Sequence, residues 1–382
     1  MKKSMTAAAV FSAFACSAFA ADVQLYGVID TGLRYLHSDL ENQGSTNKFS
    51  MESGQQSGSR FGFKGTEDLG NGLSVGFILE NQFNSDDGSL KDGLLFRRET
   101  SLFIEGGFGK LAFGRMGSIN GGTSSWGKHG VLSAFGTSWG GYVAQADTVF
   151  GNSGLWNNMI AYETPNFGGF KAFAQYGMGN QVKNHSGFEN ESSSDRYYAV
   201  GTSYANGPLN LFLSVDSINY ASYNPDTKAT SKQDDSLTVR LGGNYDFEVA
   251  KVYVGAAYFD EVKLSSFAGA VTDVFSVDNK DLAAQIKLKG WSTGVSGLIP
   301  VANGNAMIGA AYMDAKTAGS MQNDADFSRW IISAGYDYPL SKRTNVYGVV
   351  TYNRDSVDVR DSRIQSVDPN VYGIMVGMRH AF

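Results

Sequence analysis

Alternation of apolar and polar side chains is the dominant pattern of this chain, and it is clear from residue 23 onward. Leu25, Ile29 and Leu33 share one parity of the sequence. Gln24 and Asp30 share the other parity. Because successive side chains of a β-strand point to opposite faces, this period of two predicts a strand with one apolar and one polar face.

The same period recurs to the end of the chain and predicts sixteen strands. They cover residues 23–36, 60–66, 73–82, 97–106, 110–115, 157–163, 169–177, 196–204, 209–219, 236–247, 251–262, part of 282–299, 306–315, 329–338, 345–355 and 371–382. Short polar connections such as EDLGNG and ANGPLN alternate with long ones such as LENQGSTNKFSMESGQQ. All six prolines fall in connections or at strand edges, where a missing N–H removes no ladder hydrogen bond.

The last strand, VYGIMVGMRHAF, is apolar on one parity up to its final residue. Ile374, Val376 and Met378 share one parity, the other parity holds three glycines or alanines and one arginine, and the printed sequence ends at Phe382. A soluble domain usually ends in a polar, frayed tail. The pattern therefore predicts that the outer face of this strand meets something other than water.

The first twenty residues have the features of an export signal. Lys2 and Lys3 precede an uncharged stretch that ends in Ala18-Phe19-Ala20, an A-x-A cleavage site. We therefore predict a cleaved secretory signal peptide over residues 1–20 and a single barrel domain over residues 21–382. A lipoprotein signal anchored at Cys16 is an alternative, although the leucine expected three positions earlier is absent.

Composition narrows the class of protein. Removing the signal takes two of the 31 basic residues and none of the 37 acidic ones, which leaves a mature net charge of −8 and argues against nucleic acid as a partner. No later run reaches the roughly 18 apolar residues of a spanning helix, and mean hydropathy is −0.21. Export, 47 glycines and 49 aromatic residues together favour an all-β, 16-stranded antiparallel transmembrane β-barrel.

A soluble β-sandwich or β-propeller is the alternative fold, since its buried faces also alternate. Tyrosines near many strand ends favour a barrel with interfacial girdles. No repeat of about 40–50 residues is visible, which argues against a propeller.

Three stretches carry a family resemblance: SRFGFKGTEDLGNGL (59–73), FGKLAFGR (108–115) and LSKRTNVYG (340–348). With DVQLYGVID near the start and GMRHAF at the end, they resemble the Gram-negative general porins, particularly the neisserial and beta-proteobacterial branch. The resemblance implies a homotrimer of sixteen-stranded barrels in the outer membrane of a Gram-negative bacterium, in contact with lipid and lipopolysaccharide. Each barrel would hold a water-filled channel for passive diffusion of small hydrophilic solutes and ions.

The resemblance also gives two segments a role. In such porins a long third loop folds into the barrel and narrows the pore, and here that loop would be residues 116–156. A loop of this length usually has a function. Phe382, with Met378, Val376 and Ile374, looks like the signal read by the barrel-assembly machinery. Simple anchoring of Phe382 at the membrane interface is a compatible reading.

The pore charges follow from parity and resemblance. Arg60 and Lys64 are four residues apart on the polar side of one strand, hence on the lumen face. By resemblance, Arg60 and Arg98 belong to a basic cluster opposite the third loop. Strict parity would turn Arg115 toward lipid, so we predict that it turns inward where the loop starts. The alternative for each arginine is a strand-end charge that pairs with lipopolysaccharide or a neighbour.

The loop side of the predicted constriction is mixed in charge. Asp147 is the single carboxylate of the loop, and Lys128 accompanies it, with Glu163 just beyond. Related anion-preferring porins carry a basic residue near the end of this loop, where this chain has Leu155 and Trp156. We therefore predict only a mild anion preference, because outer loop acids are screened over about 10 Å at 0.1 M salt.

Other functions have weaker support. No histidine spacing matches a zinc site and no glycine-rich phosphate loop follows a strand, so we predict no cofactor. A solute-specific channel is the nearest alternative. An enzyme would need a triad, for which His129 near Ser124, Ser125 and Ser133 is the one loose candidate, and we predict none. Adhesion by surface loops would be additional to a pore.

Overall fold

The structure is a computed structural model that describes residues 23–39, 44–179, 189–224, 227–231, 233–267, 286–318, 325–359 and 366–382. The predicted signal segment, Cys16 and the first four residues of the predicted 282–299 strand region lie outside these ranges. No helix within them is long and apolar enough to cross a membrane.

Strands dominate the described residues. Their bounds are β1 (Gln24–Asp39), β2 (Ser45–Ser53), β3 (Arg60–Gly70), β4 (Leu73–Glu80), β5 (Glu99–Gly106), β6 (Gly109–Gly117), β7 (Leu155–Glu163), β8 (Phe170–Gly177), β9 (Arg196–Asn206), β10 (Leu209–Asn219), β11 (Tyr223–Asn224), β12 (Ala229–Thr230), β13 (Leu237–Asp246), β14 (Lys251–Lys263), β15 (Lys287–Val301), β16 (Gly304–Thr317), β17 (Ala325–Pro339), β18 (Thr344–Val359) and β19 (Asn370–Ala381). The connections contain η1 (Lys91–Gly93), η2 (His129–Leu132), α2 (Ala146–Phe150) and η3 (Leu264–Ser266).

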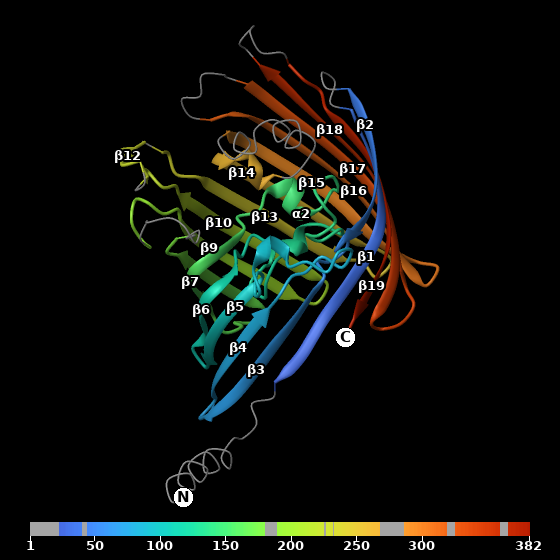
Figure 1. Cartoon of the computed structure of the whole chain (residues 1–382). Helices are drawn as coiled ribbons and strands as arrows, with labels where there is room; N and C mark the ends of the chain where they lie inside the picture. The colour runs from blue at the N-terminus through green and yellow to red at the C-terminus, as the bar shows by residue number, and fades with distance from the viewer. Residues whose placement is uncertain are drawn as a thin grey trace, which may run out of the picture.

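Apart from β11 and β12, which pair with each other, the strands form one closed antiparallel barrel (Figure 1). Each long strand pairs with its neighbours in sequence, and β1 pairs with β19 from Val28↔Ala381 to Asp39↔Asn370. The other edge of β1 pairs with β2 over Thr31–Asp39 and with β3 over Gln24–Val28. Since β2 and β3 share one position, the 17-stranded sheet has sixteen positions around the barrel. The predicted fold class and strand number are confirmed, and all sixteen predicted strands overlap a barrel strand.

β2 is the main error of the sequence prediction. Its residues fall within the stretch that we interpreted as a long polar loop. Phe49 and Met51 do alternate and point outward, but the remaining positions of β2 are polar. The alternating pattern therefore contains only two apolar residues. Pairing with the strongly alternating β1 supplies what the local pattern lacks.

The two faces of the wall differ as the alternation requires. The outer face carries exposed apolar side chains on most barrel strands, for example Leu241, Val254, Val295, Ile308, Ile332, Val350 and Ile374. The alternate positions face the interior and include buried polar and charged groups such as Asp30, Arg240 and Arg329. An apolar exterior with a polar interior is the arrangement of a transmembrane barrel.

Short turns connect neighbouring strands at one end of the barrel. Between β15 and β16, Val301 pairs with Gly304, which leaves a two-residue turn. Both turn residues, Ala302 and Asn303, have positive φ, at 50° and 64°. This is the geometry that matches the right-handed twist of a hairpin.

Candidate functional site

The third loop, residues 118–154, connects β6 to β7, and α2 within it lies inside the ring of strands (Figure 1). Its first part contacts β5 and β8. The Ser125 N–H donates to Glu99 Oε2 at 2.8 Å, and the Ile119 N–H donates to Gln175 Oε1 at 2.8 Å. Trp126 is buried in an apolar cluster shared with these strands. These contacts fix the first part of the loop to one side of the barrel.

Two buried arginines hold α2 on the opposite side. Arg240 on β13 donates from Nε to the Phe150 carbonyl at 2.9 Å. Arg329 on β17 donates from Nη1 to another α2 carbonyl at 3.4 Å. Their ion-pair partners are Asp216 for Arg240 and Asp355 for Arg329. The last carbonyls of a helix lack partners within it, so these arginines stabilise the end of α2.

Glycines on the wall make room for α2. A Cβ on Gly255 of β14 would lie 2.5 Å from Cζ of Phe150. A Cβ on Gly294 of β15 would lie 3.4 Å from the same atom. Gly255 in particular permits a closer approach of the Phe150 ring than alanine would.

The tip of the loop reaches β18. The rings of Trp139 and Tyr347 meet edge to face with centroids 5.1 Å apart. Thr351 Oγ1 donates to the Tyr142 carbonyl at 2.7 Å. The loop therefore crosses the interior from β5 and β8 to β13, β17 and β18, and the wall of β1, β3 and β4 borders the open part of the lumen.

His129 and Asp147 lie together within the packed loop. His129 is fully buried, and its Nδ1 is 3.4 Å from Asp147 Oδ1. Asn152 donates to Asp147 Oδ2 at 2.6 Å. Burial lowers the pKa of His129; Asp147 acts in the opposite direction, and Arg240 adds to the lowering. His129 is therefore neutral at pH 7.

The open wall holds a compact group of charges. Glu80 on β4 receives Arg98 Nε at 2.5 Å and lies 3.5 Å from Arg60 Nε. Tyr26 on β1 donates its hydroxyl to the same carboxylate at 3.0 Å. The structure thus brings together the predicted Arg60 and Arg98, with one carboxylate between them.

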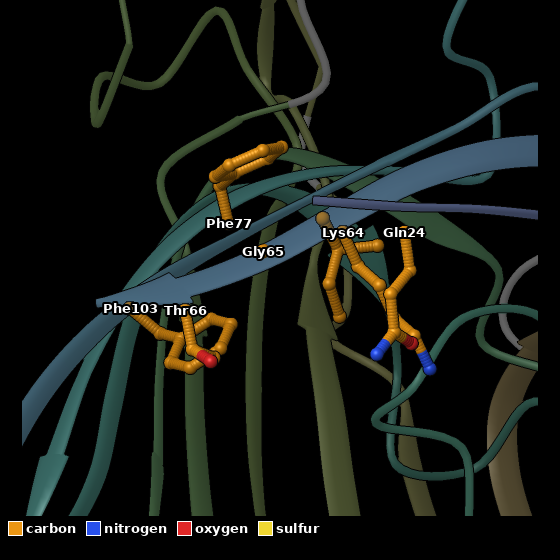
Figure 2. Close-up of a pocket in the computed structure, with 7 residues that line it drawn as sticks. Gln24, Lys64, Gly65, Thr66, Phe77 and Phe103 are labelled. Atoms are coloured by element: carbon orange, nitrogen blue, oxygen red, sulfur yellow. The ribbon is translucent and has the colours of Figure 1, made fainter. Parts of the chain in front are cut away.

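Lys64 lies farther along the same face, beside a cavity of about 270 Å³. Figure 2 shows Lys64, Gln24 and Phe103 on one side of the strands, whereas Phe77 points to the other side. Lys64 Nζ is 5.3 Å from the centroid of the Tyr26 ring. Lys64 and Arg60 thus share the interior face, at different positions along β3.

A second group of charges lies near the turns of β5 to β8. Lys128 Nζ of the third loop is 3.6 Å from Glu163 Oε2, and Lys171 of β8 pairs with the other oxygen of Glu163. Glu105 and Lys110 complete the charged lining of a cavity of about 370 Å³ here. Lys128 and Glu163 are therefore together, but they belong to this group and not to the group of Arg60.

Arg115 lies apart from both groups. Gly114, with φ of 131°, begins an irregularity in the β6–β7 register. Arg115 pairs with Thr100 on β5, whose side chain is exposed. Its guanidinium donates to the Arg97 carbonyl at 2.7 Å and to Asn157. These contacts place it at the strand ends beside Arg97.

The C-terminal residues close the barrel. The N–H of Phe382 donates to the Gly27 carbonyl at 3.1 Å, and the N–H of Gly27 donates to the Phe382 carbonyl at 3.1 Å. Ile374, Val376 and Met378 are exposed on the outer face. Their role as an assembly signal stays a prediction.

Neither Arg240 nor Arg329 was among the predicted site residues, although both hold α2. Each is a lone arginine on the polar parity of an apolar strand, in LTVRLGG and FSRWIIS. A charge at mid-strand in a wall that faces lipid on its other side is a usable signal for an interior anchor. Within the described ranges, no three His, Cys, Asp or Glu side chains are grouped to hold a metal ion.

Comparison with known proteins gives consistent matches. A family model described as Gram-negative porin matches residues 6–358. An outer membrane porin protein of Bordetella pertussis is 33% identical over 422 residues, with 100% of both chains covered. Outer membrane porin protein 32 of Delftia acidovorans is 29% identical over 397 residues, also with 100% of both chains covered.

Among solved structures, an anion-selective porin from Comamonas acidovorans is similar over the whole fold. The TM-score is 0.68 at 25% sequence identity, and the match covers 95% of this chain and 100% of that chain.

A further relative by sequence is the major outer membrane protein P.IB of Neisseria gonorrhoeae. It is 26% identical over 361 residues, which covers 90% of this chain and 91% of the relative.

Proposed function

This chain belongs to the Gram-negative porin family, and from that premise we propose that it is a general-diffusion channel with a mild preference for anions. It is an outer-membrane β-barrel that lets small hydrophilic solutes and ions diffuse passively across the membrane. The family and the closed barrel with a polar interior support this function.

One observation carries the anion preference: Arg60 and Arg98 share the single carboxylate of Glu80 on the open wall. Two cations with one anion leave a positive excess, and Lys64 adds a further positive charge on the same face. Fixed charge in a cleft with low-dielectric walls raises the local concentration of counter-ions. The solved relative from Comamonas acidovorans, which is described as anion-selective, adds support.

The test is reconstitution in a planar bilayer with a potassium chloride gradient. We expect a reversal potential that gives a chloride-to-potassium permeability ratio moderately above one. A ratio clearly below one would overturn the anion preference. Conductance that saturates with one class of solute would instead favour a solute-specific channel.

We further propose that the functional particle is a homotrimer. Phe49 and Met51 on β2 are among the exposed apolar side chains, and Met51 lies level with Leu33 and Val376 of the apolar band. Among the described residues, one edge of β2 pairs with β1, and no strand pairs with the opposite edge of β2. An open edge in lipid is costly, which favours cover by a second copy. Current steps that close in groups of three would support the trimer, and single independent steps would contradict it.

We propose no catalytic role. His129 is the one histidine near the loop serines, but among the described residues no hydrogen bond joins either ring nitrogen to a serine hydroxyl. Ser125 donates to Glu99 and Ser133 donates to the Ala144 carbonyl. The nucleophile–base contact that a triad requires is therefore not formed there. The relatives, which are named as porins, support the same conclusion.

The remaining proposals concern processing and surroundings. We infer that residues 1–20 are removed on export, so that N-terminal sequencing of the mature protein should begin at Ala21. Lipid and lipopolysaccharide are the proposed partners of the exposed outer face, and the barrel-assembly machinery is the proposed reader of the strand that ends in Phe382.

A further inference from the structure

The connection between β2 and β3, residues 54–59, is too long for the gap that it spans. The β1 register pairs Thr31 with Ser53 and Val28 with Arg60. Only Ile29 and Asp30 of β1 lie between these pairs, opposite six residues of the connection. In a regular ladder two residues would suffice, so about four residues must leave the wall.

The connection leaves the wall toward the interior. Gln56 Nε2 donates to Asp337 Oδ2 on β17 at 3.0 Å, and Asn345 Nδ2 on β18 donates to Gln56 Oε1 at 2.7 Å. From the shared β2/β3 position, β17 is the fourth strand along the wall, beyond β1, β19 and β18. Four spacings of about 4.8 Å amount to about 19 Å, far more than a glutamine side chain can span. The backbone must therefore cross inside the barrel, over β1 and β19.

Glycines on these two strands accommodate the crossing. A Cβ on Gly32 of β1 would lie 2.2 Å from Gln55 Nε2 and 2.9 Å from Cα of Gly377 on β19. Gln55 is buried, and its Nε2 donates to the Val376 carbonyl at 3.3 Å. The connection is thus packed onto the seam of the barrel and does not project freely into the lumen.

Asp30 anchors the crossing to the third loop. This fully buried carboxylate accepts from the backbone N–H groups of Gln56 at 2.9 Å and Ser57 at 2.7 Å. Its other oxygen accepts from the Tyr347 hydroxyl at 2.5 Å. Tyr347 in turn packs edge to face against Trp139 of the third loop. Asp30 therefore links residues 54–59, through Tyr347, to the third loop.

The same connection holds the basic side of the pore. Arg60 Nη1 donates to Ser57 Oγ at 2.9 Å and to the Gly58 carbonyl at 3.0 Å. A Cβ on Gly58 would lie 3.1 Å from Arg98 Nη1, so the connection is packed against that guanidinium as well. The directions in which both arginines point depend on the path of residues 54–59.

We propose that residues 54–59 are a second constriction element, which narrows the channel beside the tip of the third loop and orients Arg60 and Arg98 toward passing anions. The inference rests on the proposed channel function. It assigns to Gln56 a place on the ion path and to Ser57 the role of a positioning residue for Arg60.

Charged labelling at Gln56 tests the place on the ion path. Gln56→Cys, made with Cys16→Ser so that no other thiol is present, keeps the backbone bonds to Asp30. We expect an anionic thiol reagent to lower the chloride-to-potassium permeability ratio and a cationic reagent to raise it, by about twofold each for a unit charge about 8 Å from the ion. Conductance should fall with both reagents.

Gln233→Cys is the matched control, because Gln233 is an exposed side chain between β12 and β13. It should label without change in the permeability ratio. Conducting channels in which Gln56→Cys behaves like this control would overturn the inference while leaving the channel function intact. Absence of conductance from the folded, unsubstituted protein would instead overturn the proposed function.

Ser57→Ala tests the positioning role. The substitution removes the hydroxyl that accepts from Arg60 and leaves the Ser57 N–H on Asp30. We expect the permeability ratio to fall by up to about twofold, the effect of moving one unit charge away from the ion path, with conductance nearly unchanged. An unchanged ratio would overturn the role of Ser57 as a positioning residue for Arg60.

Discussion

Glu80 is the residue through which the charges of the open wall are balanced. Its carboxylate receives Arg98 and Tyr26 and lies beside Arg60. A buried or half-buried carboxylate with several donors is strongly held. Glu80 therefore both fixes the two arginines and cancels part of their field.

Replacement of Glu80 by glutamine should strengthen the anion preference. Glutamine keeps the size of the side chain but removes one negative charge from the open wall. A unit charge about 8 Å away in water contributes about 0.5 kcal/mol for each ion, with opposite signs for chloride and potassium. Screening over about 10 Å at 0.1 M salt roughly halves each contribution, so the chloride-to-potassium permeability ratio should rise about twofold. Reversal potentials of Glu80→Gln and the unsubstituted protein measure the change.

Glu191→Gln is the control for this prediction, because Glu191 is an exposed residue in the connection before β9. It removes the same charge at a place where salt screens it. Equal permeability ratios for Glu80→Gln and Glu191→Gln would contradict the assignment of Glu80 to the ion path.

Parity in the sequence was sufficient to place Arg60 and Lys64 on one interior face, because a strand has a fixed period of two. It could not place Arg98 against Glu80, since that contact depends on the β4–β5 register, in which Glu80 pairs with Glu99. Parity also puts Arg115 on the same side as Phe113, and its pairing with Thr100, whose side chain is exposed, agrees with that side. What parity could not give are its bonds to the Arg97 carbonyl and to Asn157, which come from other strand ends.

Among the elements, the third loop depends most on contacts that the sequence does not reveal. Its length marks it as functional, but its place is decided by arginines from β13 and β17 and by Gly255, which lie far from it in sequence. The barrel strands are different, because their own alternation predicts them. β2 is intermediate: Phe49 and Met51 alternate, but the strand is recognised only when β1 is beside it.

The packing of the third loop should weaken in acid. Burial holds the pKa of His129 below its ordinary value of about 6.5. Near pH 6.5 the buried imidazole of the packed loop is therefore still neutral, whereas the exposed imidazole of a released loop would already bind a proton. Below about pH 6.5, proton binding therefore favours the released loop, and the stability of the packed loop falls as pH falls. Asp147 facing the ring reduces this effect, and Arg240 increases it.

Current fluctuations recorded between pH 7.5 and pH 5 check this prediction. They should increase toward low pH in the unsubstituted protein, and His129→Phe should remove that part of the pH dependence. His380→Asn is the control, since His380 is exposed near the turns and bonds only Thr344 among its described side-chain contacts. If His129→Phe retains the full pH dependence, another group is responsible.

At the scale of the whole molecule, the barrel separates lipid from water by side-chain parity alone. The outer positions of the long strands are apolar and exposed, while the interior positions hold buried ion pairs such as Arg329 with Asp355. The chain-wide alternation and the apolar end at Phe382 were enough to predict closure, because an open sheet edge is not tolerated in lipid.

Arginine on the outer face should destabilise the barrel in proportion to its depth. Val350 lies near the middle of β18 and is exposed, so Val350→Arg should cost about 2–4 kcal/mol of unfolding free energy in lipid vesicles. Thr66→Arg on the interior face should change it little. Denaturant titration of both variants measures the difference, and equal stabilities would contradict the assignment of Val350 to the lipid-facing side.

The seam between β1 and β19 also bears on how the molecule reaches its folded state. Every other ladder joins strands that are close in sequence, whereas this one joins the two ends of the chain, through Gly27 and Phe382. Pairings of large sequence separation carry the greatest loop-closure entropy and form slowly. We expect refolding in vesicles to complete this seam last, and chains that stall before it will present two bare strands able to join those of other copies.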